Sequence, residues 1–301
     1  MDERELKALL AADEHHWWYR GRRLIIGAEL DRLPLPAGAR VLDAGCGSGR
    51  TLQDLREYGE VAGIELSELA AEHARSRRLG EVRVGRVESL PWEDGTFDLV
   101  TCLDVLEHTP DDRVALRELR RVTKSGGWLL LTVPAYPALW STHDVVNHHH
   151  RRYTRRGLRR VATEAAWRVD RLTSFNSLLL PAAAALRISQ RYRGRTHHDH
   201  VSELRVGRQW LNGVLERPLR LEAAMLRRGY TLPAGLSLLA VLENVAAPAG
   251  VADGEAVAAG AAVPASPGVA ASPGVAASPG VAASPGVTAS PAVAARGGAT
   301  G

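Results

Sequence analysis

The sequence predicts an α/β fold in which helices flank a mostly parallel sheet. Between residues 41 and 133, short apolar stretches typical of buried strands alternate five times with segments typical of helices. A glycine-rich turn follows the first of these strands and leads into a helix. Acidic side chains stand after several strands. Right-handed crossovers gather such strand ends at one edge of the sheet, where open α/β sheets bind their ligands.

The turn after the first strand is rich in glycine. From Val41 to Gly49 it has the sequence VLDAGCGSG. Gly45, Gly47 and Gly49 allow backbone conformations closed to other residues, and they let a ligand approach the main chain without a Cβ in the way. A dinucleotide-binding fingerprint, G-x-G-x-x-G, would need its third glycine at position 50, which is Arg50. This departure argues against NAD and leaves an NAD-dependent oxidoreductase as a weaker alternative.

Acidic residues end the first two strands. Asp43 can accept hydrogen bonds from an ammonium or a hydroxyl group. The second strand, over 61–65, ends at Glu65, twenty residues after Gly45. Nucleotide-binding sheets place an acid at this distance to accept hydrogen bonds from ribose hydroxyls. The two acids therefore predict one site for a nucleoside.

The other elements follow in order. Helices are predicted over 2–12, 24–33, 51–58, 68–78, 111–122 and 154–166, and strands over 82–84, 97–102, 128–133, 167–175 and 237–243. Two further helices, over 178–188 and 203–228, are expected before the last strand, with Pro218 opening a new helix. An apolar stripe on the second stretch predicts either core packing or a cap over a lipid-linked substrate.

The motif Asp43-x-Gly-x-Gly-x-Gly49 resembles the first motif of class I S-adenosylmethionine-dependent methyltransferases. The segment Leu103-Asp-Val-Leu-Glu-His108 closely resembles the fourth motif of that family. The segment Gly85-Arg-Val-Glu-Ser-Leu-Pro-Trp92 is similar to the motif between them, except that Arg86 replaces the acid that receives the adenine amino group. The resemblance implies a Rossmann-like sheet of seven strands with the last strand antiparallel, and S-adenosyl-L-methionine as the cofactor.

The resemblance also implies which residues hold the cofactor. With Arg86 in place of the usual acid, the Val87 backbone and Glu88 remain as candidates for adenine recognition, and Leu103 and Asp104 would border the methionine part. The full implied set is Asp43, Gly45, Cys46, Gly47, Gly49, Glu65, Leu66, Val87, Glu88, Leu103 and Asp104, together with Arg20 from the N-terminal segment.

The N-terminal stretch Glu14–Arg23, EHHWWYRGRR, combines aromatic and cationic side chains. It resembles the His-Trp-Trp-aromatic-Arg element of a bacterial subgroup of the family, and it predicts a lid within residues 1–36. Arg20, Arg22 or Arg23 would pair with the carboxylate of the ligand, and an aromatic ring would shield a sulfonium by a cation–π contact. The alternative is that the aromatic residues only pack the N-terminal helices on the sheet.

The loop after the fifth strand, residues 134–153, is expected to meet the methyl acceptor. It carries four histidines, and we predict His143 as the general base, oriented by Asp144, with His148 as the second candidate. Deprotonation by an imidazole fits a hydroxyl acceptor, so transfer to oxygen is expected. The histidine spacing matches no standard zinc site and no cysteine accompanies it, so no metal ligand is predicted.

Composition sets the cellular context. A net charge of +4 fits an acidic partner or a membrane surface, or simply a bias towards arginine. With only Cys46 and Cys102, no disulfide framework is expected, and a reducing cytoplasm fits. The sequence shows neither a signal-peptide pattern nor an apolar run of the ~20 residues that span a bilayer. We therefore predict a cytoplasmic protein, with peripheral contact at the inner face of the membrane as an option.

The predicted domain organisation is a methyltransferase domain over 1–245, with a helical insertion or cap over 176–232, followed by a tail over 246–301. In the tail, Ser-Pro recurs every six residues from 266 to 290, and this composition predicts disorder. The expected partner is a small-molecule or lipid- or sugar-linked acceptor, and no nucleic acid is expected. A methyltransferase-fold scaffold without catalysis is the rival from a different functional class.

Overall fold

The computed structural model describes residue 10 and residues 12–182, 185 and 209–245. The chain divides into two compact units, Met1–Gly250 and Val251–Gly301, and all of the described helices and strands belong to the first. The predicted tail over 246–301 lies outside the described residues, as do most of the predicted N-terminal helix and residues 186–208.

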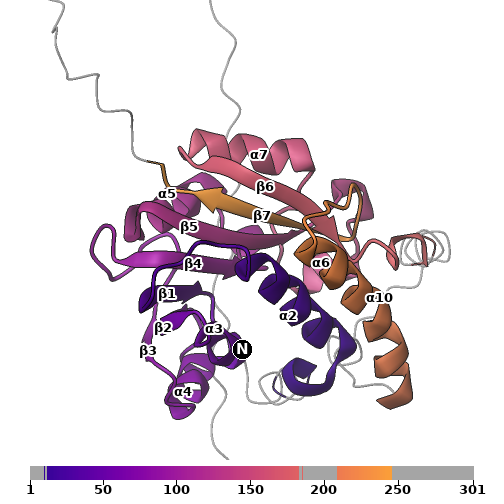
Figure 1. Ribbon diagram of the computed structural model, residues 1–301, viewed down its shortest axis with the longest axis horizontal. Coiled ribbons are helices and arrows are strands. Elements are labelled where there is room, and N and C mark those ends of the chain that lie inside the picture. Colours follow the sequence, from indigo (N-terminus) through magenta and orange to yellow (C-terminus); the bar gives the residue numbers. More distant parts are fainter. Residues whose placement is uncertain (1–9, 11, 183–184, 186–208, 246–301) are drawn as a thin grey trace, which may run out of the picture. The chain divides into compact units, whose positions relative to one another are not determined.

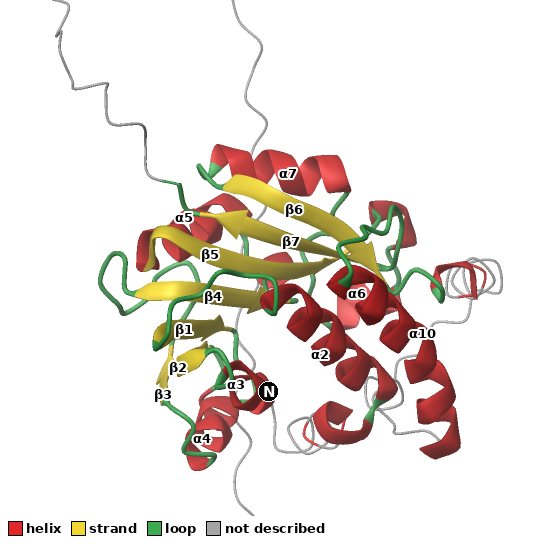
Figure 2. Cartoon of the chain, in the orientation of Figure 1, coloured by secondary structure: helices red, strands yellow, loops and turns green. Residues whose placement is uncertain are grey.

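A seven-stranded sheet in the order β3-β2-β1-β4-β5-β7-β6 forms the centre of this unit (Figure 2). The strands are β1 (Ala39–Ala44), β2 (Gly59–Glu65), β3 (Glu81–Val84), β4 (Phe97–Leu103), β5 (Thr123–Pro134), β6 (Arg168–Phe175) and β7 (Ser237–Glu243). The first five strands are parallel, and β7 runs antiparallel between β5 and β6. The predicted Rossmann-like arrangement is therefore confirmed.

Helices cover both faces of the sheet (Figure 1). They are α2 (Trp17–Leu30), α3 (Arg50–Leu55), α4 (Glu68–Ser76), α5 (Asp112–Val122), α6 (Thr142–Val146), α7 (Arg155–Glu164) and α10 (Gln209–Arg227), with 3₁₀ turns η1 (Leu106–His108) and η2 (Pro137–Leu139). Residues of α2, α3, α4 and α10 share a core with one face of the sheet, and residues of α5 and α7 share a core with the other. No described helix is both long and apolar enough to cross a membrane.

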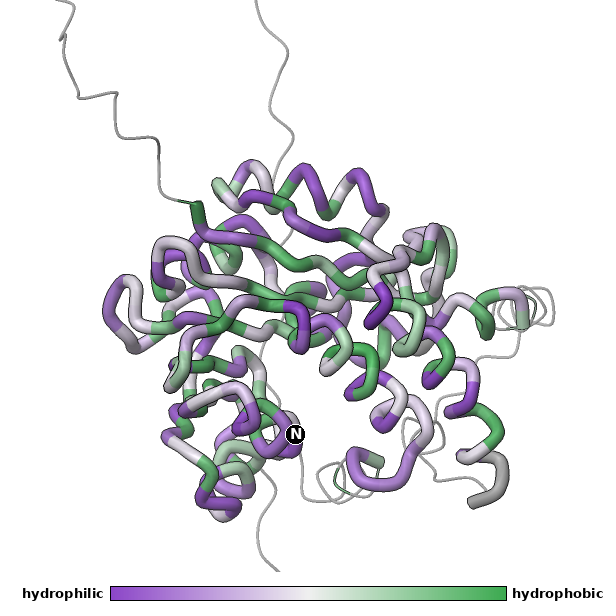
Figure 3. Tube along the Cα trace, viewed as in Figure 1, coloured by the Kyte–Doolittle hydropathy of each residue, from purple (hydrophilic) through white to green (hydrophobic). Residues whose placement is uncertain are grey.

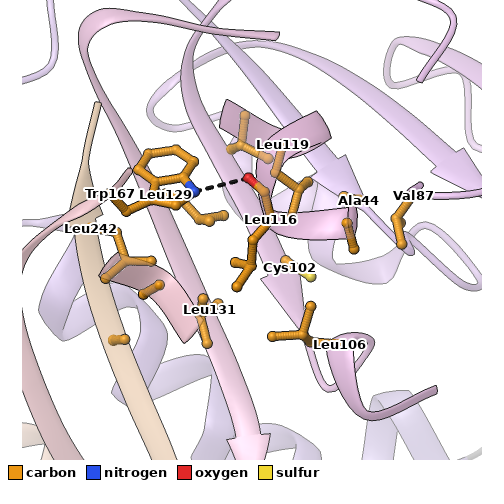
Figure 4. Close-up of a cluster of buried hydrophobic side chains, with 14 of the residues drawn as sticks. Ala44, Val87, Cys102, Leu106, Leu116, Leu119, Leu129, Leu131, Trp167 and Leu242 are labelled. Carbon is orange, nitrogen blue, oxygen red and sulfur yellow. Dashed lines mark hydrogen bonds between the residues drawn. The ribbon is translucent and has the colours of Figure 1, made fainter. Parts of the chain in front are cut away.

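Side chains alternate between the two faces of the sheet along each buried strand, so each strand contributes to both hydrophobic cores. In β5, Leu129 and Leu131 face α5 and α7, whereas Leu130 faces α2 and α10. Figure 3 shows the longest hydrophobic stretches along the middle strands, with polar residues prominent on α7. On the α5 side, the indole Nε1 of Trp167 donates a 2.9 Å hydrogen bond to the carbonyl of Leu116, so this buried ring has a partner for its polar atom (Figure 4).

Two local predictions are wrong, and both errors lie where α2 packs against α10. Helix α2 begins at Trp17, because His16 caps it by accepting a hydrogen bond from Trp18 N, so the aromatic segment forms the first turns of the helix. Helix α10 runs through Pro218 without ending there. Gly21 permits this packing, since a Cβ there would lie 2.1 Å from Leu219 Cδ1. Close contact along α2 thus outweighs the helix-breaking tendency of the proline.

Candidate active site

The glycine-rich turn forms a bare bend at the C-terminal end of β1. Gly45, Gly47 and Gly49 have φ values of 89°, 53° and 77°, a region that favours glycine. A Cβ on Gly45 would lie 2.3 Å from Val105 Cγ2, whereas a Cβ on Gly47 would meet no atom within 4 Å. The amides of Gly45 and Cys46 donate to the carbonyl of Ile64 at 2.9 and 3.0 Å, which fixes the turn against β2. Space for a ligand therefore opens at Gly47.

Asp43 lies beneath this bend and is only 2 % exposed. Thr101 Oγ1 donates a 2.7 Å hydrogen bond to Asp43 Oδ1. Burial raises the pKa of Asp43 to about 6, and the Thr101 hydrogen bond and the Arg22 charge oppose part of this rise. The carboxyl group therefore changes its charge in the weakly acidic range.

Glu65 joins two loops at the end of β2. Its Oε2 accepts a 3.0 Å hydrogen bond from Gly47 N, and its Oε1 accepts a 2.9 Å bond from Ser67 N. Both bonds hold the carboxylate beside the glycine turn, and each oxygen can accept a further hydrogen bond. Next to it, Leu66 is exposed, while Val87 is buried. Glu88 pairs with Arg86 at 3.2 Å, so the arginine that departs from the family motif has a partner within its own loop.

Asp104 lies at the end of β4 in a left-handed conformation, with φ of 56°. Its carboxylate pairs with Arg22 of α2, while Leu103 before it is buried. The Arg22 guanidinium lies over the rings of Trp18 and Tyr19, with 4.9 and 5.6 Å to their centroids. The aromatic and cationic segment thus reaches the same edge as the acids of β1 and β2.

The structure places Arg20 elsewhere. Its Nε lies 3.0 Å from Glu216 Oε2 of α10, and its side chain is 43 % exposed. Sequence reasoning named Arg22 only as an alternative to Arg20. The helical period could have favoured Arg22 for this role. In a helix that begins at Trp17, Arg22 comes four residues after Trp18, so the two side chains lie on the same face of α2. The role given to Arg20 in cofactor binding stays a prediction.

Residues 12–16 lie against the glycine turn. Ser48 Oγ donates a 2.6 Å hydrogen bond to Asp13 Oδ2, and Arg23 Nη1 donates one of the same length to Asp13 O. Glu14 Oε1 lies 3.4 Å from Arg50 Nε at the start of α3. These contacts tie the N-terminal segment to the first turn of the sheet edge.

The segment after β5 closes on itself around Asp144. This residue is fully buried, and its Oδ1 accepts from Arg152 Nε at 2.6 Å and lies 2.9 Å from His149 Nδ1. Its Oδ2 accepts from Ser141 N at 2.8 Å. Tyr153 N donates to Pro134 O at 2.9 Å, which closes the base of the segment.

The three predicted catalytic residues have different surroundings. His143 falls in α6, but its side chain lies outside the described residues. His148 is exposed and has a φ of 54°. The described partners of Asp144 are instead Ser141, Arg152 and His149, a histidine that sequence reasoning missed. The sequence offered no means of choosing among adjacent histidines as the partner of Asp144, because the point at which α6 ends determines which ring turns back towards that residue.

His149 lies against a second chain segment. Its ring is 4.7 Å from that of His108, edge to face, and Glu107 is beside both. Glu107 is 1 % exposed, and its Oε2 forms no hydrogen bond. Burial and the Asp104 charge raise the pKa of Glu107 well above its usual range, whereas desolvation and His149 lower the pKa of His108 to about 4. A polar cluster thus stands directly after the strand that carries Asp104.

Part of this chain matches a known protein family. Residues 42–131 match the family described as a methyltransferase domain. They include the ends of β1, β2 and β4 with Asp43, Glu65 and Asp104. This match makes residues 42–131 a methyltransferase domain. Solved structures share the fold of this chain, among them a putative methyltransferase of Bacillus halodurans at 19 % identity and a TM-score of 0.51, covering 74 % of this chain and 99 % of that one.

Curated relatives match only part of this chain. An uncharacterized 37.1 kDa protein in transposon TN4556 of Streptomyces fradiae is 34 % identical over 176 residues, 52 % of this chain and 51 % of the relative. A ubiquinone biosynthesis O-methyltransferase of Xanthomonas axonopodis pv. citri is 40 % identical over 104 residues, 32 % of this chain and 44 % of the relative. The chain thus spans about half the length of these relatives or less.

The site residues fit S-adenosylmethionine. A ligand can approach the main chain at Gly47, where no side chain intervenes, and two carboxylates at the ends of β1 and β2 lie beside it. Arg22 and the Trp18 ring occupy the side of Asp104, where a carboxylate and a sulfonium would find complementary groups.

Proposed function

We propose that this chain transfers the methyl group of S-adenosylmethionine to a hydroxyl group of a small-molecule or lipid- or sugar-linked acceptor. The observation that carries the proposal is the convergence of Asp43, Glu65 and Asp104 around the bare bend at Gly47, with the His108–His149 pair directly beyond Asp104. Transfer to oxygen is supported further by the O-methyltransferase name of a relative that is 40 % identical over a third of this chain.

The cofactor would be held mainly by the edge formed by β1, β2 and β4. Glu65 would accept hydrogen bonds from ribose hydroxyls, and Asp43 would attract the ammonium group. Arg22 would exchange part of its contact with Asp104 for the cofactor carboxylate. When bound, S-adenosylmethionine supplies an electrophilic methyl group on a positively charged sulfur.

The acceptor hydroxyl would lie between the cofactor and the histidines. Its oxygen forms a bond to the methyl carbon while the carbon–sulfur bond breaks, and the electron pair of that bond goes to sulfur. His149 is the imidazole that we propose to take the hydroxyl proton, because Asp144 orients its ring through Nδ1. His143 and His148 stay predictions for this role.

Orientation is the main task of such a site, since well-aligned reactants gain about 7–11 kcal/mol over the bimolecular reaction. We propose that residues 1–36 act as a lid and that the insertion over 176–232 caps the acceptor. The contacts of Asp13 and Glu14 with the glycine turn support the lid, and the packing of α2 on α10 joins it to the described part of the cap.

Calorimetry with S-adenosylmethionine, S-adenosylhomocysteine and NAD tests the cofactor. Micromolar binding of the first two and none of NAD is the expected result. Incubation with S-adenosylmethionine and a panel of phenols, catechols and lipid-linked sugars, followed by measurement of S-adenosylhomocysteine, tests the transfer. A folded protein that binds neither adenosyl compound would support the scaffold and contradict the proposal. Cofactor binding with methyl transfer only to amines would contradict the hydroxyl acceptor.

A further inference from the structure

We propose that Glu107, His108 and His149 form a binding site for a divalent transition-metal ion of the zinc class. One carboxylate oxygen and two imidazole nitrogens, one from each residue, lie within 4.8 Å of one another. Two histidines and one glutamate are a ligand set of catalytic zinc sites, which leave a further position open. The three residues come from two segments, the 3₁₀ turn after β4 and the loop after α6.

The buried oxygen of Glu107 is the observation that points to an ion. Glu107 is 1 % exposed, and Oε2 has no hydrogen-bond partner. A buried carboxylate oxygen without a partner is costly, and native structures rarely leave one in this state. A bound cation would satisfy this oxygen.

Charge around the cluster favours the same conclusion. The buried Asp144 and Glu107 carry two potential negative charges, and buried Arg152, paired with Asp144, supplies one positive charge. The guanidinium of Arg22, also close to Glu107, is paired with Asp104. When Glu107 is ionised, it is therefore the carboxylate of this group that pairs with no cation of the described residues, and a bound ion would balance its charge.

The surroundings of His149 match those of a metal ligand. Its Nδ1 contacts Asp144 Oδ1 at 2.9 Å, so Nε2 is the nitrogen turned away from this carboxylate. Histidines that bind metals commonly donate their other ring N–H to a carboxylate, which fixes the tautomer and the ring. Arg152 and Ser141 in turn hold Asp144.

Small side-chain movements would complete the site. In a tetrahedral zinc site with metal–ligand distances of about 2.0–2.1 Å, the ligand atoms lie about 3.3–3.4 Å apart. The present upper limit of 4.8 Å therefore needs a closure of up to about 1.5 Å, to which rotation of the exposed His108 can contribute. Sequence spacing does not bring these three residues together, because Glu107 and His108 are some forty residues before His149.

The role of this site rests on the proposed function. The site narrows the acceptor to hydroxyl compounds that can bind a metal ion through oxygen. The ion would lower the pKa of that hydroxyl. With an ion bound, His149 would act as a ligand and the hydroxyl proton would pass to solvent; in the ion-free protein, His149 keeps the role of base given to it in the proposed function.

Zinc binding to the full chain tests the site. Three further histidines, at 197, 198 and 200, lie outside the described residues, and imidazoles are zinc ligands, so all three are replaced by alanine in a common background. In that background, calorimetry should give one zinc ion per chain with a micromolar or tighter Kd. Cobalt(II) should give visible absorption bands, and zinc should raise the unfolding temperature.

Glu107→Gln, His108→Ala and His149→Ala should each weaken zinc binding at least tenfold. His150→Ala, a matched change in the same run of histidines, should leave it within about threefold. Circular dichroism and S-adenosylmethionine affinity show whether each variant is folded, and the exposed His108 offers the change least able to disturb folding.

The site is refuted if the background protein binds no zinc, cobalt or manganese below 1 mM, or if the three variants bind as tightly as it does. Methyl transfer is measured separately from zinc binding, by S-adenosylhomocysteine production, so failure of the enzyme function can be told apart from failure of the site. Zinc binding that depends on Glu107, in a protein that transfers no methyl group, would uphold the site and refute the enzyme function. Methyl transfer by a protein that binds no zinc would refute the site and uphold the enzyme function.

Discussion

The proposed cofactor edge and the proposed acceptor edge of this chain are built in different ways. At the cofactor edge, backbone geometry dominates: glycines at positive φ follow β1, and each acid stands at or directly after the end of its own strand. At the acceptor edge, side chains from the turn after β4 and from the loop after α6 meet, and buried Asp144 holds them. Short motifs can encode the first arrangement, whereas the second depends on long-range folding.

Asp144→Ala should have the largest effect and should affect only the acceptor edge. It leaves the buried Arg152 unpaired and releases His149, so we expect a loss of about 3–5 kcal/mol in unfolding free energy. Methyl transfer should fall about 10²- to 10⁴-fold. Denaturant melts and S-adenosylhomocysteine production measure the two effects. If the edges are independent, S-adenosylmethionine affinity changes less than threefold; a larger change would show that they are coupled.

Gly45→Ala should damage the cofactor edge almost as strongly. The new Cβ would lie 2.3 Å from Val105 Cγ2 on a backbone with φ of 89°. Strain and overpacking together cost about 2–5 kcal/mol. We expect S-adenosylmethionine affinity to fall at least tenfold in calorimetry. Adding Val105→Ala should relieve the clash but not the backbone strain, so only part of the affinity should return; full recovery would contradict a role for positive φ.

Asp43→Asn should weaken cofactor binding about tenfold and yet stabilise the free protein at neutral pH. The pKa of Asp43 is about 6 when folded, against an ordinary value of 3.8. Folding therefore favours the protonated form, and as pH rises from about 4 to 6 the wild type loses up to about 3 kcal/mol relative to the variant. Denaturant melts at several pH values measure this difference. A constant difference between the two proteins would contradict the raised pKa.

The wild-type cofactor affinity should follow the same titration. Because the ionised carboxylate attracts the ammonium group, S-adenosylmethionine binding should weaken as pH falls below about 6. Calorimetry on Asp43→Asn should show this dependence flattened.

Gly47→Ala against Gly38→Ala is the finest comparison. Both glycines have positive φ, 53° and 72°, and a Cβ on either would meet no atom within 4 Å. Each change should cost about 1 kcal/mol of stability from the backbone alone. Only Gly47→Ala should lower S-adenosylmethionine affinity, since its Cβ would enter the space given to the ligand. Equal affinities would place the ligand elsewhere.

Much of this fold follows from local sequence. The apolar run of β1, its three glycines and Glu65 after β2 give the order of the first elements, and the structure confirms all of them. The antiparallel β7 was expected from family resemblance and is also present. The start of α2 was missed because the cap is a histidine, His16. The continuity of α10 through Pro218 was missed because the packing of this helix on α2, remote in sequence, supports it.

The sequence by itself determined the parallel sheet, the bare glycine bend and the acids at the strand ends, since strand periodicity and turn chemistry act over a few residues. Only the tertiary structure decided that Arg22 reaches Asp104, that Asp144 holds His149, and that both histidine rings meet at Glu107. Those pairings depend on which segments pack together. Burying a charged group without a partner is costly in free energy, so these groups are paired with whichever partner the packing of the segments places next to them.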